Sequence, residues 1–63
     1  MSELRIIIPS GIALRAPIYV EDIERVADVL TRQLPIIAAE NGRATAVIVK
    51  DGITHFIAGH RRN

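Results

Sequence analysis

The sequence predicts a small α+β domain in which a β-sheet packs against one amphipathic helix. Three observations predict it: a β-branched run near the start, apolar residues at three- and four-residue steps in the middle, and two β-rich runs joined by Asp51-Gly52. We therefore expect an N-terminal strand and a C-terminal β-hairpin in one sheet, packed on a kinked helix. With 63 residues, residues 1–63 have room for a single α/β domain.

The N-terminal strand is predicted over residues 4–8, Leu-Arg-Ile-Ile-Ile, because β-branched side chains favour a pleated sheet. Pro9-Ser10-Gly11 then forms a turn. Residues 12–17 are less clear. Ile12 and Leu14 suit an edge strand, whereas Pro17 removes a backbone donor and restricts the residue before it.

The helix is predicted from Val20 onward, where apolar residues recur with helical spacing and charged residues fall between them. Glu21, Asp22 and Glu24 lie in its first turn, where carboxylates interact favourably with the helix dipole. Asn41-Gly42 is a typical helix end.

Pro35 lies inside this helical pattern. A proline in a helix interior costs about 3 kcal/mol, because it lacks the backbone N–H and its ring meets the preceding turn. We therefore expect a kink or break near Leu34, followed by a short second helix that reaches Glu40.

The hairpin is predicted from residues 44–49 and 53–58, because Asp-Gly between two β-rich runs is a strong hairpin signal. A two-residue turn would give the two faces different residues. One face would carry Val47, Val49, Thr54 and Phe56, and the other Ile48, Lys50, Ile53, His55 and Ile57. Both faces are partly apolar, so the one that does not meet the helix needs a cover.

The composition predicts self-association. Hydrophobic residues make up 49% of the chain, which is a high share for so small a domain. Cysteine is absent, which excludes disulfides and thiolate metal sites. We expect a homo-oligomer, with an oligomer or partner interface that includes Ile18, Tyr19, Val20, Ile48, Ile53 and Ile57.

The charges and the N-terminal residues argue for a cytoplasmic protein without a membrane segment. The formal net charge is +1, so the chain as a whole is not strongly basic. Residues 1–5 do not resemble a signal peptide, and no window approaches the roughly 20 apolar residues of a membrane span.

No pattern typical of an enzyme is present. Serine and threonine residues do not lie beside histidine in a nucleophile motif, and no glycine-rich phosphate loop or zinc spacing occurs. His55 and His60 should point to opposite faces of a strand, which makes a shared metal site unfavourable. We therefore expect no enzymatic activity, no cofactor and no metal.

The C-terminal residues Gly59-His60-Arg61-Arg62 directly follow a predicted strand. Backbone amides and guanidinium groups in this arrangement suit a phosphate, and Arg43 and Lys50 could add charge to the same site. The alternative interpretation is a solvated basic tail that is frayed at its end.

Residues 47–62, Val-Ile-Val-Lys-Asp-Gly-Ile-Thr-His-Phe-Ile-Ala-Gly-His-Arg-Arg, resemble the segment of ParB-type partition proteins that leads into a G-E-R-R box. Residues 20–30 are similar to the helix before that segment, so the resemblance is to the N-terminal (ParB/sulfiredoxin-like) domain. It implies nucleoside triphosphate binding, with Gly59, Arg61 and Arg62 at the phosphates. His60 replaces the family's glutamate and no G-x-x-Q-P segment is found, so hydrolysis and specific DNA binding are not implied.

A weaker resemblance is to the small tautomerases, which share the length and order of elements. Their base is an N-terminal proline, whereas Ser2 follows Met1 here. Two functional hypotheses stay open. The first is a small regulatory or inhibitory homo-oligomer, of the kind mobile elements encode, that binds a partner protein. The alternative is a ParB-like module that binds nucleotide phosphates or nucleic acid.

Overall fold

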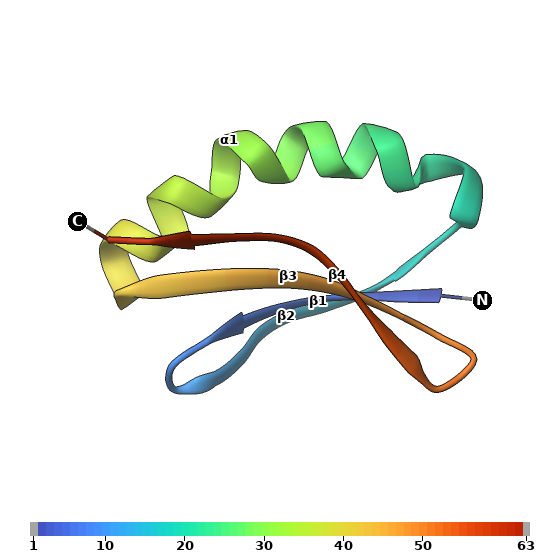
Figure 1. The fold of residues 1–63 in the computed structure, drawn as a ribbon, viewed down its shortest axis with the longest axis horizontal. Helices are drawn as coiled ribbons and strands as arrows, with labels where there is room; N and C mark the ends of the chain where they lie inside the picture. Colours follow the sequence, from blue (N-terminus) through green and yellow to red (C-terminus); the bar gives the residue numbers. More distant parts are fainter. Residues whose placement is uncertain (1, 63) are drawn as a thin grey trace.

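The chain folds as a four-stranded antiparallel sheet with one helix on one side, as predicted for the fold class (Figure 1). The computed structural model describes residues 2–62. Their elements are β1 (Ser2–Ile8), β2 (Gly11–Ile18), the 3-10 turn η1 (Val20–Asp22), α1 (Ile23–Asn41), β3 (Arg43–Lys50) and β4 (Ile53–Arg61). The spatial order is β2-β1-β3-β4, so each hairpin supplies one edge strand.

The N-terminal strand has a partner that the sequence indicated only weakly. Residues 12–17 lie within β2, which pairs with β1 as an antiparallel edge strand. Pro17 is tolerated there because an edge strand leaves alternate N–H groups without a ladder partner. Leu14 pairs with Ile6 and Ile12 with Ile7, so Ala13 is an extra residue that forms a β-bulge.

The helix is continuous, so of the two alternatives predicted near Leu34 the break, with its separate second helix, is wrong, and the kink stays a prediction. Helix α1 runs from Ile23 to Asn41 with Pro35 inside it. Leu34 and Ala38 on either side of Pro35 are buried in the core, and their packing outweighs the local cost of the proline. The predicted helix end is confirmed: Gly42 has φ +96° and donates its N–H to the Ala38 carbonyl at 2.7 Å.

The C-terminal hairpin is confirmed. Asp51 and Gly52 have φ values of 54° and 75°, as the preferred two-residue hairpin turn requires. The observed pairs Val47 with Phe56 and Ile48 with His55 match the predicted faces. Strand β4 is longer than predicted, because it continues through Gly59 and His60 to Arg61.

The core lies between α1 and the facing side of the sheet. Its buried members are aliphatic and come from α1 and from every strand except β4: Leu4, Ile6, Ile18, Leu30, Leu34, Ala38, Ala44, Ala46 and Ile48. From β4, Ile57 and Ala58 pack against this cluster while half-buried. Ile18 and Ile48, two residues of the predicted interface, are 7% and 3% exposed and so belong to the chain's own core.

The opposite side of the sheet, which we call the open face, is not covered by α1 (Figure 1). It carries the side chains that alternate with the core residues along each strand. In residues 2–62, no helix has both the length and the apolar character needed to cross a membrane.

Candidate functional site

The open face is organised as rows of cross-strand neighbours. One row runs across all four strands and joins Phe56, Val47, Arg5 and Arg15. The next row toward one end joins Thr54, Val49, Glu3 and Pro17. Toward the other end lie Gly59, Thr45, Ile7 and Ile12, followed by the pair Arg61 and Arg43. Arginines and apolar side chains therefore share this surface.

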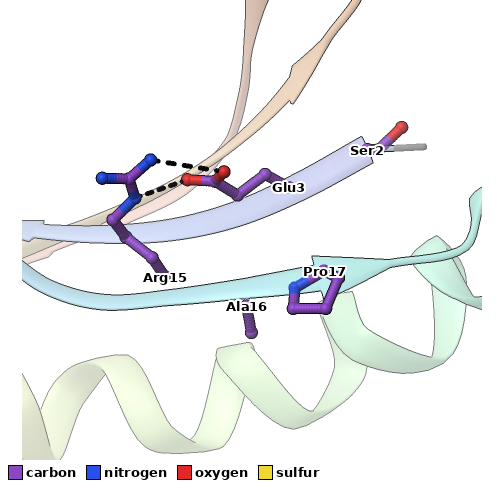
Figure 2. Close-up of a pocket in the computed structure, with 5 residues that line it drawn as sticks. All are labelled: Ser2, Glu3, Arg15, Ala16 and Pro17. Atoms are coloured by element: carbon purple, nitrogen blue, oxygen red, sulfur yellow. Dashed lines mark hydrogen bonds and ion pairs between the residues drawn. The ribbon is translucent and has the colours of Figure 1, made fainter.

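Glu3 offsets one of the two positive charges of an arginine pair on the open face. Arg5 and Arg15 are direct cross-strand partners, and each donates an Nε–H to Glu3 Oε1 at 2.7 Å. The hydrogen bond from Arg15, followed by that from Arg5, lowers the pKa of Glu3 to about 2. Figure 2 shows the Arg15–Glu3 pair on the side of the sheet away from α1, beside a pocket of about 210 Å³.

Arg43 and Arg61 form a second arginine pair, which no acidic side chain of residues 2–62 neutralises. They are direct cross-strand partners, and among residues 2–62 neither forms an ion pair with an acidic side chain. Like charges directly opposite each other destabilise a sheet by roughly 0.2–1 kcal/mol. A bound anion would remove this repulsion, so the pair is a candidate anion-binding element.

A bulge in β4 creates this second pair. The hairpin pairs Val47 with Phe56, and an uninterrupted register would place His60 opposite Arg43. The register instead shifts by one residue at Ile57, so Arg61 becomes the partner of Arg43. The bulge therefore turns Arg61 onto the open face and His60 onto the helix side.

Phe56 is an aromatic platform next to the arginines. Its side chain is 69% exposed, although its cross-strand neighbour Val47 is buried. A methyl group built on Gly59 would lie 3.5 Å from Cε1 of Phe56, so the ring lies over this glycine. The ring is thus directed along β4 toward the Arg43–Arg61 pair.

A shallow depression of about 530 Å³ lies at this end of the sheet. It is lined by Arg43, Thr45, Gly59, His60 and Arg61. The structure therefore brings together four of the six residues predicted to bind phosphate, and adds a threonine hydroxyl.

Arg62 and Lys50, the other two predicted residues, lie elsewhere. Arg62 donates from Nη1 to the Ala39 carbonyl at 3.1 Å and from its backbone N–H to Gly42, so it holds the end of α1. Lys50 lies at the opposite end of β3 from Arg43, about 23 Å away at about 3.3 Å per strand residue. Residues 59–61 of the predicted box thus belong to β4 and Arg62 follows it, and all four are exposed to solvent.

The remaining predicted interface residues do not form one patch with the arginines. Tyr19 and Val20 are exposed at the start of α1, and Ile53 is exposed beside the β3–β4 turn. Ile57 is half-buried against the core. None of these four lies in the rows of the open face.

The histidines do not lie as predicted. His55 pairs with Ile48 and His60 with Ala44, so both lie on the helix side of the sheet. The bulge at Ile57 reverses the alternation that would have separated them. Residues 2–62 hold no group of three or more histidine, aspartate or glutamate side chains placed to bind a metal ion.

In a comparison with known proteins, no family model, curated protein or solved structure matches this chain. The resemblance to ParB-type partition proteins therefore stays a prediction. The site has to be interpreted from its geometry.

Sequence reasoning missed several residues of the open face, among them Arg5, Arg15, Thr45 and the platform role of Phe56. The alternation in residues 3–7 was a usable signal, since Glu3, Arg5 and Ile7 must share one face of a strand. No local sequence pattern indicated that these side chains lie beside Arg15, because that contact depends on the pairing of β1 with β2.

Proposed function

We propose that this chain binds single-stranded nucleic acid through the open face of its sheet. The observation that carries the proposal is the cross-strand pair Arg43 and Arg61, which has no acidic side-chain partner within residues 2–62 and borders the exposed ring of Phe56. Phosphates would bind the guanidinium groups, and a base would stack on the ring.

The distribution of charge supports the proposal. In the described strands, the open face carries Arg5, Arg15, Arg43 and Arg61 against the carboxylate of Glu3. Most acidic residues lie instead on η1 and α1, on the other side of the sheet: Glu21, Asp22, Glu24, Asp28 and Glu40. A polyanion is therefore attracted to one side of the molecule, although the net charge is only +1.

A single strand suits this surface better than a duplex. Reading a duplex requires an element that enters a groove, whereas these arginines lie on a four-stranded sheet with an exposed aromatic ring. Unstacked bases can reach such a ring, and sheet surfaces with exposed aromatics are a common way to bind single strands.

Fluorescence anisotropy with a labelled single-stranded oligonucleotide tests the proposal. We expect affinity to fall as salt rises, because phosphate contacts release counterions. The double variant Arg43→Ala/Arg61→Ala should lower the magnitude of the slope of log K against log salt by about 1.4, at about 0.7 per contact. Phe56→Leu should weaken binding about tenfold, because stacking contributes roughly 1–3 kcal/mol per base.

Arg32→Ala is the matched control, since it removes an exposed arginine from α1 and leaves the open face intact. It should bind as the wild type does. Stronger binding of a duplex, a free nucleoside triphosphate or an acidic polypeptide in competition would redirect the assignment to that ligand. Undiminished binding by the double arginine variant would refute the role of this face.

The protein-binding regulator predicted from composition is the second candidate function. The observation that favours it is an apolar groove on the helix side, lined in part by Leu14 and Val29. Such a surface suits apolar side chains rather than phosphates. Salt-dependent binding of a single-stranded oligonucleotide separates the two candidates, because an apolar groove predicts no such binding.

A further inference from the structure

An apolar groove runs beside α1 on the helix side of the sheet. Its volume is about 360 Å³, and its walls are Leu4, Ile6 and Leu14 from the sheet and Val26, Val29 and Ile37 from the helix. Leu14 and Val29 are 43% and 46% exposed, so the chain itself does not fill the groove.

The groove exists because α1 lies closer to one half of the sheet. The helix contacts β3 and β4 more extensively than β1 and β2, and the fully buried Ala38 on the helix and Ala44 and Ala46 on β3 allow near approach. The helix-facing side of β2 is covered less, and Leu14 projects there without a helix above it. An elongated apolar element could occupy this space.

The helix flank beside the groove has a self-complementary pattern. Arg25, Val29, Gln33, Ile36 and Glu40 follow one another at steps of three or four residues and therefore share one flank. Along this stripe the side chains are, in order, positive, apolar, polar, apolar and negative. When a second copy of the stripe lies alongside in the opposite direction, the positive end of each stripe faces the negative end of the other. The two apolar positions then also face each other.

Two antiparallel copies of α1 related by a two-fold axis would match these charges. Arg25 would meet the partner's Glu40, and Val29 would meet the partner's Ile36, each contact occurring twice. Glu40 forms no ion pair within residues 2–62, and Arg25 has only a 3.6 Å contact with Asp22. Ile36 is 56% exposed, although it lies on a core-packed helix.

We propose that a second copy of this chain occupies the groove, with the two α1 helices packed antiparallel along this stripe. The dimer is isologous, so each copy fills the groove of the other. This surface lies on the other side of the sheet from the arginines of the open face, and the proposal does not depend on nucleic-acid binding.

Sedimentation equilibrium without nucleic acid tests the dimer through two charge reversals. Arg25→Glu places glutamates 25 and 40 opposite each other, and Glu40→Arg places two arginines opposite each other. Each variant should raise the dimer Kd by roughly tenfold or more, because both symmetric contacts become repulsive. Neither change opposes the helix dipole, but Arg25→Glu also replaces the contact with Asp22 by a repulsion, so the helix content of each variant is measured as well.

The decisive sample is an equimolar mixture of the two variants. A mixed dimer pairs two glutamates of one chain with two arginines of the other, so the mixture should regain the wild-type dimer mass. Asp28→Lys on the opposite flank is the control and should dimerise normally, and circular dichroism should show equal helix content in all samples. A wild type that stays monomeric at several hundred micromolar, or a mixture that stays monomeric, would overturn the proposal.

Discussion

At the scale of single residues, Glu3 links the charged side chains of β1 and β2 and makes stability depend on pH. Its pKa is lowered from 4.5 to about 2 by the hydrogen bonds from Arg15 and Arg5. Because the folded state lowers this pKa, the contribution to stability is fully present above pH 4.5 and is lost as pH falls toward about 2.

We predict that Glu3→Gln removes this pH-dependent contribution. Near neutral pH the variant should have a lower free energy of unfolding than the wild type, because the neutral amide cannot offset the Arg5–Arg15 pair. The difference should shrink between pH 4.5 and about 2 as wild-type Glu3 becomes protonated. Urea unfolding at several pH values measures it, and a difference that does not vary with pH would contradict the assignment.

At the scale of elements, α1 shows that packing can override local preference. In a regular helix the Thr31 carbonyl would accept a hydrogen bond from the backbone N–H of residue 35, and Pro35 has no such N–H. The Thr31 hydroxyl donates a hydrogen bond to the Ala27 carbonyl at 2.9 Å. The helix nevertheless continues to Asn41, because Leu34 and Ala38 must both reach the core.

Pro35→Ala should therefore stabilise the protein. The higher helix propensity of alanine raises the free energy of unfolding by about 3 kcal/mol. The greater flexibility of the unfolded chain lowers it by about 0.4–1 kcal/mol, so the expected net gain is about 2 kcal/mol. Chemical denaturation measures the gain. Arg32→Ala, an exposed helix substitution with no proline involved, should stay within about 0.5 kcal/mol of the wild type. A destabilised Pro35→Ala would show that the core requires the ring.

Elements with local chemical signals were predictable from the sequence, whereas those that depend on long-range pairing were not. Asp51-Gly52 and Asn41-Gly42 placed a turn and a helix end, because these residues adopt the backbone angles needed there. The pairing of β2 with β1 and the bulge at Ile57 had no comparable local signal. The bulge decides the site, since it places Arg61 rather than His60 opposite Arg43.

At the scale of the whole molecule, charge is separated across the sheet. The acidic residues of η1 and α1 lie on one side, and the arginines of the open face lie on the other. Exposed charges separated by more than the Debye length, about 10 Å at 0.1 M salt, are largely screened from each other, so each side acts largely by itself. The placement of a charge should therefore matter more than the net charge.

Two substitutions that each remove one charge, and that change the net charge in opposite directions, test whether placement or net charge controls binding. Arg61→Gln lowers the net charge from +1 to 0, and Asp28→Asn raises it to +2. If placement controls binding, Arg61→Gln should weaken single-strand binding and lower the magnitude of the salt slope by about 0.7, whereas Asp28→Asn should change affinity less than about twofold. Anisotropy titrations at several salt concentrations measure both. Equal and opposite shifts would mean that net charge governs the interaction, and the open face would then hold no special position among the charged surfaces of the chain.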